Sequence, residues 1–210
     1  MQGKESSSNP EEGQLQLPEL VTNRHLLFGS RKASSSSAVK PPLAQELLEH
    51  YSPEQLRAHF FSLGLGMKNI SFSPKMFTPN AHPKAPDPVL KEGNLLCNVF
   101  NRSARSCFYT IQKYTAGRIP VGAPDEELRE AARQVILQFE RDMHQRIFHQ
   151  AFSGVDKYIR QINKYWTANM KQLSFDESPD AFRQVLINSF YMLRVAASLM
   201  HPIAPKGCEM

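Results

Sequence analysis

Helical periodicity in the second half of the chain is the feature that most constrains its fold. From about residue 87 to residue 202, apolar residues recur every three or four positions, and Pro or Gly residues divide the pattern into four long segments. A segment with this period buries one face and exposes the other, so each segment needs neighbours that cover its apolar stripe. Four such segments joined by short links predict an antiparallel helical bundle.

The spacing of apolar residues also predicts where the four helices lie. Their stripes cover residues 96–114, 128–139, 148–166 and 182–200. Gly117 and Pro120 stop the first helix, and Ser178 with Pro179 opens the fourth, because Ser is a good N-cap and Pro fits the first turn of a helix.

Residues 1–80 have a different character. Residues 1–20 are polar and predict a flexible tail. The segment HLLF before Gly29 predicts a strand, and RKASSSSAVKPP after it predicts an exposed, mobile loop. We expect two short helices here, one over LAQELLEHY and one that begins at SPEQ, which has the pattern of a capping box. The segment NISFS predicts a second strand. We therefore expect a mainly α fold, in which a small α/β linker unit of residues 21–80 precedes a helical bundle of residues 87–205.

Composition excludes several classes of protein. The 210 residues are 41% hydrophobic, which supplies enough apolar material for a core. No apolar run approaches the roughly 18 residues that span a bilayer, and the N-terminus is too polar for a secretory signal, so we expect a cytoplasmic protein without membrane contact. The three cysteines lack the spacing of zinc ligands, so we expect no metal site. The common catalytic motifs are missing as well, and we expect no catalytic residues in this chain.

Charge is unevenly spread along the bundle. Residues 84–118 carry six Lys or Arg and two acids, residues 141–172 again carry six and two, and residues 119–140 carry two and five. If the first and third helices share a side, they form a positive surface that attracts phosphates. The alternative is that these are ordinary solvated helix faces. The net charge of +5 permits a polyanionic partner without requiring one.

A row of polar side chains on the first bundle helix is the best candidate site. Asn94, Asn98, Arg102, Arg105 and Tyr109 recur every three or four residues, away from the apolar stripe. An amide beside a guanidinium on a rigid helix can read the edges of unstacked bases, and Arg can also stack or bind phosphate. The alternative is a helix face that only contacts water.

Three stretches of the sequence resemble the anticodon-binding helical domain of methionyl-tRNA synthetases, which are class I enzymes. They are NLLCNVFNRSARSCFYTIQKYTAGRIP, IRQINKYW and LINSFYMLRVAASLMHPIAPKGCEM. Upstream, SPEQLRAHFFSLGL is similar to the linker that follows the KMSKS-type loop in that family. The loop falls on Lys32, Ser34 and Ser36, with Ser35 in place of its second lysine. The resemblance runs from about residue 21 to residue 205.

The resemblance implies roles for individual residues. Asn98 and Arg102 fall on positions that contact the anticodon in the family, and Arg105 lies beside them. The aromatic residue that stacks on an anticodon base in the family falls near Gln172 here. Trp166 is the aromatic candidate in this chain, although its register matches the apolar stripe. The implied partner is therefore the anticodon arm of a tRNA, rather than DNA.

The family's catalytic Rossmann domain, with its HIGH-type motif, has no counterpart ahead of residue 21. We expect this chain to bind no cofactor and to be inactive alone, whereas ATP and Mg would serve the complete enzyme. A separate catalytic half would then be a second partner, and the chain would be a fragment, a split subunit or a truncated paralogue. The alternatives for function are a non-catalytic tRNA- or RNA-binding module and a helical protein-interaction domain.

Overall fold

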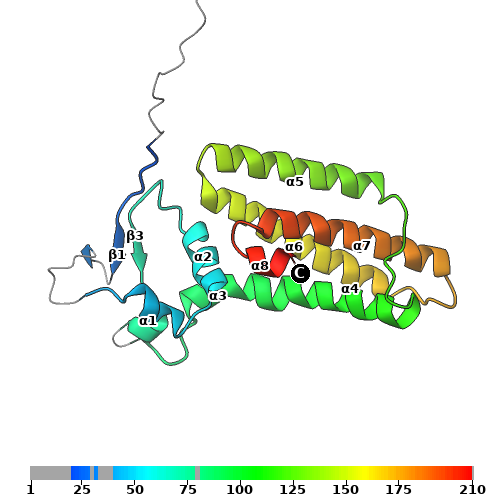
Figure 1. Cartoon of the computed structure of the whole chain (residues 1–210), viewed down its shortest axis with the longest axis horizontal. Coiled ribbons are helices and arrows are strands. Elements are labelled where there is room, and N and C mark those ends of the chain that lie inside the picture. The colour runs from blue at the N-terminus through cyan, green and yellow to red at the C-terminus, as the bar shows by residue number, and fades with distance from the viewer. Residues whose placement is uncertain (1–19, 29–30, 33–39, 79–80, 210) are drawn as a thin grey trace, which may run out of the picture.

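The computed structural model describes residues 20–28, 31–32, 40–78 and 81–209. The predicted tail of residues 1–20 lies almost entirely outside these ranges. The fold is mainly helical, as the sequence predicts. A small sheet with short helices forms one end of the molecule, and long helices run away from it side by side (Figure 1).

The small sheet has the strand order β2-β1-β3. The central strand β1 (Leu26–Phe28) pairs in parallel with β3 (Ile70–Phe72), and both strands were predicted. The prediction of a loop from Arg31 onward is wrong at its first two residues. Arg31 and Lys32 form β2 (Arg31–Lys32), which pairs antiparallel with β1. Such a short strand is defined by the neighbour with which it pairs, so its own composition gave no signal.

Two short helices lie between β2 and β3 along the chain, α1 (Ala44–Leu48) and α2 (Pro53–Ser62). The predicted capping box at α2 is confirmed: the backbone N–H of Gln55 donates to Ser52 Oγ at 3.2 Å, and the backbone N–H of Ser52 donates to Gln55 Oε1 at 2.8 Å. A 3₁₀ turn, η1 (Lys75–Phe77), comes after β3. The core of this end of the molecule is a separate cluster of Leu47, Tyr51, Phe72 and Val89.

The first long helix is continuous but not uniform. It consists of α3 (Pro88–Asn94), a π-helical turn η2 (Leu95–Phe100) and α4 (Asn101–Tyr114). The sequence predicts the whole helix and its end, where Gly117 has a φ of +77° that glycine adopts easily. It does not predict the π turn. Leu95 is buried although it lies outside the predicted stripe, and the side chains of residues 96 and 97 are not described.

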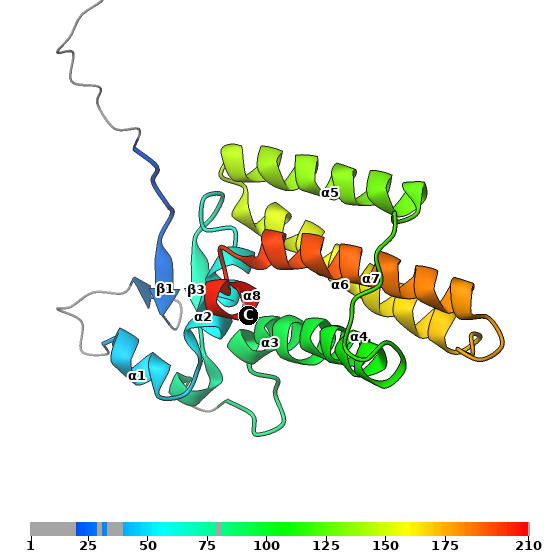
Figure 2. The ribbon, with the colours of Figure 1, turned by 45° about the vertical axis from the view of Figure 1, so that its right-hand side comes forward.

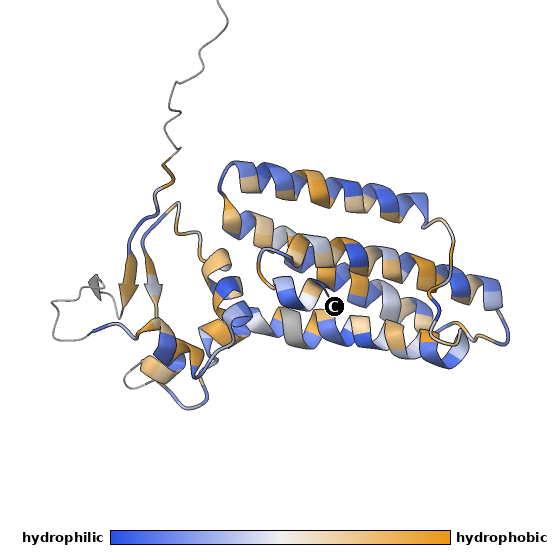
Figure 3. Cartoon of the chain, in the orientation of Figure 1, coloured by the Kyte–Doolittle hydropathy of each residue, from blue (hydrophilic) through white to orange (hydrophobic). Residues whose placement is uncertain are grey.

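The remaining helices complete the antiparallel bundle. They are α5 (Glu126–His144), α6 (Phe148–Met170), α7 (Pro179–Met200) and the short α8 (Pro205–Glu209). Figures 1 and 2 show α6 and α7 in the middle, with α5 on one side of this pair and α4 on the other. Along each long helix hydrophobic and hydrophilic residues alternate with the helical period (Figure 3). The apolar stripes therefore meet in one main core, which α2 joins through Ala58.

A buried amide fixes the connection between α4 and α5. Asn188 of α7 is 0% exposed, and its Oδ1 accepts the backbone N–H of Asp125 at 3.0 Å. Its Nδ2 donates to Asp125 Oδ2 and to the hydroxyl of Tyr165, both at 2.7 Å. Asn188 Oδ1 also accepts from Gln184 Nε2, one turn earlier in α7, at 3.2 Å. One side chain thus joins the start of α5 to α6 and α7 through partners far away in the sequence.

The carboxylate of Asp87 sets the direction of the first long helix. Its Oδ1 caps α3 by accepting the backbone N–H of Val89 at 2.8 Å and of Leu90 at 3.3 Å. Its Oδ2 accepts the hydroxyl of Tyr51 at 2.6 Å and the backbone N–H of Lys75 at 3.2 Å. Burial and the hydrogen bond to Asp87 raise the pKa of the Tyr51 hydroxyl, so it remains a donor. The start of the helix is therefore tied to two separate segments of the small unit.

His59 of α2 is a buried histidine beside this cluster. It is 5% exposed and packs near the ring of Phe72, with 5.7 Å between ring centroids. Its Nδ1 has no hydrogen-bond partner in the described part of the chain. Burial lowers its pKa below the ordinary value of 6.5, although the charge of Asp87 acts in the opposite direction. The folded protein therefore holds His59 in its neutral form.

Replacing Asp87 by Ala should destabilise the fold by about 2 to 4 kcal/mol, because the cap of α3 is lost and the buried Tyr51 hydroxyl loses its acceptor. Asp87→Asn keeps a capping oxygen and should cost about 1 kcal/mol. Urea unfolding followed by circular dichroism measures both variants. Equal stability of Asp87→Ala and the wild type would show that the cluster does not hold the helix.

His59 should make stability depend on pH. The unfolded chain binds the His59 proton more readily than the folded chain, so stability is present above about pH 6.5 and is lost as the pH falls from there toward the lower folded pKa. The slope for one group is at most about 1.4 kcal/mol per pH unit. His59→Phe, which preserves a ring among Phe neighbours, should remove this part of the dependence. Urea midpoints of both proteins between pH 5 and 8 provide the comparison, and parallel curves would contradict it.

Candidate nucleic-acid interface

The polar row predicted on the first bundle helix forms one continuous surface. Asn98, Arg102 and Arg105 are all exposed. Together with Asn94, Val99, Ser106 and Tyr109 they line an open groove of about 750 Å³. The groove runs along the C-terminal end of α3, the π turn and most of α4. The structure thus brings together all five residues of the predicted row and keeps them out of the core.

Two amide side chains at the start of the groove orient each other through a hydrogen bond. Asn98 Nδ2 donates a hydrogen bond to Asn94 Oδ1. Each amide carries one acceptor and two N–H donors, so both retain capacity for a ligand after this bond is made. Asn98 lies inside the π turn, and such turns are rare and often occur at functional sites. The opposite side of this helix is anchored by the buried Leu95 and Ser103.

The two arginines of the groove are electrostatically unsatisfied. Arg102 and Arg105 form no ion pair with any carboxylate in the described part of the chain. This differs from α5, where Arg133 pairs with Glu130 at 2.8 Å and Arg129 pairs with Glu126 at 2.9 Å. The sequence explains the difference, because residues 93–124 contain no Asp or Glu. Both guanidinium groups are therefore available to an anion.

An exposed aromatic ring closes the far end of the row. The side chain of Tyr109 is 64% exposed, one helical turn beyond Arg105. Amides, guanidinium groups and an aromatic ring in one open groove are the groups that bind single-stranded nucleotides, since they read base edges, contact phosphates and stack on bases. Val99 and Ser106 also line the groove but were not predicted. For Ser106, the four-residue step from Arg102 was the signal that could have identified it.

Trp166 lies elsewhere. Its ring is half-buried and packs against both the main core and a smaller cluster of Ile111, Phe182 and Leu186 at the end of the bundle. It does not line the groove. The Asn-x-Tyr pattern before it also makes internal contacts: Ser103 Oγ donates to Asn163 Oδ1 at 3.4 Å, and the Tyr165 hydroxyl accepts from Asn188.

The predicted ATP loop is largely outside the described residues. Ser34 and Ser36 lie in the undescribed segment, and for Lys32 only the backbone, which belongs to β2, is described. Across the described ranges, no three His, Cys, Asp or Glu side chains come together as metal ligands. Within the same ranges, every helix is too short or too polar to cross a membrane.

Comparison with known proteins finds distant sequence similarity to one enzyme, methionine–tRNA ligase. No family model matches it. Methionine–tRNA ligases of Bacillus anthracis, Bacillus mycoides and Bacillus cereus are 22% identical to it over 192 residues, which is 90% of this chain and 33% of each relative. The chain thus spans about a third of the length of the curated relatives that it matches.

The solved structures give the same result for the fold. Mycobacterium tuberculosis methionyl-tRNA synthetase bound by methionyl-adenylate has a TM-score of 0.70 at 19% identity, and the match covers 88% of this chain and 35% of that one. The apo form of the same enzyme has a TM-score of 0.61 at 17% identity, and this match covers 78% of this chain and 32% of that one. The chain is therefore distantly homologous to a part of methionyl-tRNA synthetase and shares its fold.

Proposed function

We propose that this chain is a tRNA-binding portion of a methionyl-tRNA synthetase-like protein and holds the anticodon arm of a tRNA in the groove of Asn98, Arg102 and Arg105. The observation that carries the proposal is the groove itself, because its two arginines are exposed, form no ion pair with a described carboxylate and stand beside two hydrogen-bonded amides. The distant homology to a synthetase supports the choice of tRNA among possible RNAs.

The chemistry of the groove fits a nucleotide loop better than a duplex. Bases in a hairpin loop are unstacked, so their hydrogen-bonding edges are accessible to side chains on a single rigid helix. In the proposal, Asn98 reads a base edge, Arg102 reads a base or clamps the neighbouring phosphate, and Arg105 neutralises a further phosphate. The helix itself is held at Asp87, so these groups are ordered before the RNA arrives.

The proposal gives this chain a positioning role. Binding of the anticodon arm would orient the rest of the tRNA toward a separate catalytic half in the cytoplasm, and ATP with Mg would be used there to form the aminoacyl adenylate. Lys32, Ser34 and Ser36 would then belong to a loop that reaches the catalytic half. Trp166 would support the end of the bundle from its half-buried position, rather than stack on a base.

Arg102→Ala tests the proposal directly. Loss of a guanidinium that contacts a base should cost about 1 to 3 kcal/mol of binding free energy, which is roughly a 5- to 150-fold loss of affinity. Fluorescence anisotropy with a labelled hairpin that has the sequence of a methionine anticodon arm measures the loss. A hairpin with a different anticodon shows whether Arg102 reads a base, because an equal loss for both hairpins indicates a phosphate contact.

The matched control is Arg133→Ala, which removes an exposed arginine that is already paired with Glu130 on α5. It should leave affinity almost unchanged. The proposal fails if the wild-type chain binds neither hairpin at low salt, or if Arg102→Ala binds as tightly as the wild type.

A further inference from the structure

Two segments without acidic residues pack against each other in the bundle. Residues 93–124 and residues 181–208 contain no Asp or Glu, and they carry four and three Lys or Arg respectively. The first segment contains α4 and the second contains most of α7, and these helices are in contact. Residues 125–142, by contrast, carry six acids and form α5 on the opposite side of the bundle (Figure 2). The surface where α4 meets α7 is therefore cationic.

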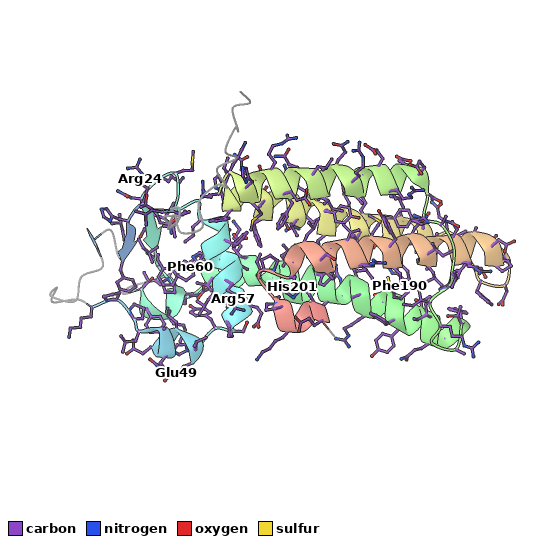
Figure 4. All side chains as sticks on the ribbon, turned by 45° about the horizontal axis from the view of Figure 1, so that its top comes forward. Arg24, Glu49, Arg57, Phe60, Phe190 and His201 are labelled. Carbon is purple, nitrogen blue, oxygen red and sulfur yellow. The ribbon has the colours of Figure 1, made fainter. Side chains whose placement is uncertain are left out.

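An exposed phenylalanine, Phe108, packs on the half-buried Phe190 at the seam between these two helices. Phe108 of α4 is 51% exposed and meets Phe190 of α7 edge to face, with 5.2 Å between ring centroids. Phe190 lies midway along α7, and His201 lies at its end near α8 (Figure 4). About half of the Phe108 side chain is thus left in water, and neither of the two segments that meet here contains an acidic residue.

Arginines flank this pair on both helices. Arg105 precedes Phe108 by one turn on α4, and Arg194 follows Phe190 by one turn on α7, about 6 Å along the axis. Arg194 has no ion pair within the described residues, and it lines a hollow with Ser198 and His201. His201 also approaches Glu209, with 3.0 Å between His201 Nε2 and Glu209 Oε1. Arg105 also lines the groove described above, so groove and seam form one surface.

We infer that RNA bound in the groove continues across α4 onto α7, where the Phe108 ring stacks on an unpaired base and Arg194 binds a backbone phosphate. This inference rests on the proposed function and extends the contact surface to a second helix. Exposed aromatic rings interleaved with unpaired cations favour a single-stranded polyanion, because the rings stack on any base while the cations follow the backbone. Arg105 lies both in the groove and beside Phe108, so it would contact the RNA where it passes from the groove to the seam.

Phe108→Leu and Arg194→Gln test the inference in the full chain. Leu retains apolar contact with Phe190 but cannot stack, so affinity for the anticodon-arm hairpin should fall about tenfold with an unchanged salt dependence. Arg194→Gln should lower affinity about three- to tenfold and should reduce the slope of log K against log salt by about 0.7. Arg133→Gln on α5 is the matched control and should change neither quantity. Thermal melts of each variant confirm that the fold is retained.

The outcomes separate this inference from the proposed function. If Arg102→Ala weakens binding while both seam variants behave like Arg133→Gln, the inference is overturned and the proposed function stands. If the wild-type chain binds no RNA, both are overturned. A blunt duplex made from the stem alone adds a further check, since Phe108→Leu should not weaken its binding. Equal losses for the hairpin and the duplex would overturn the stacking role of Phe108.

Discussion

The half-buried carboxylate of Asp87 makes the contacts on which the rest of the arrangement depends. It caps α3 and at the same time binds Tyr51 and Lys75, so the helix that begins at Pro88 leaves the small unit in one direction only. Because α3, the π turn and α4 are continuous to Tyr114, that direction also fixes the face on which the polar row lies. A surface on one continuous helix needs no further loop to organise it, which explains how exposed side chains can be positioned before a ligand binds.

Local signals in the sequence predicted much of this structure. These signals depend on neighbours within a few residues, so a single sequence contains them. They are the capping box at Ser52, the Pro at the start of helices and the period of the apolar stripes. The exposed position of Asn98 and Arg102 follows from the same period. Features made by distant partners were not predicted: β2 forms only because β1 is beside it, and Asp87 and Asn188 act through residues up to 63 positions away. The π turn at Leu95 had no local signal either.

The distribution of charge gives the molecule two unlike sides. On α5, exposed acids and arginines pair with each other along the helix, and such pairs contribute little to stability but cancel the field of the surface. On α4 and α7 the cations pair with no carboxylate among the described residues, so their field extends into solvent, which favours a polyanionic partner. The comparisons show distant homology to about a third of methionine–tRNA ligase. The cationic surface where α4 meets α7 is the physical feature that favours RNA as the partner.

Cross-linking tests the central claim most directly, because it reports where the RNA lies without altering the protein. An anticodon-arm hairpin with a photoreactive loop base would be irradiated with the full chain, and the tryptic peptides that carry RNA would be identified by mass spectrometry. The account predicts adducts on the α4 peptide between Arg105 and Lys113, which contains Phe108 and Tyr109. Adducts confined to α5 peptides such as the one that follows Arg133 would contradict it.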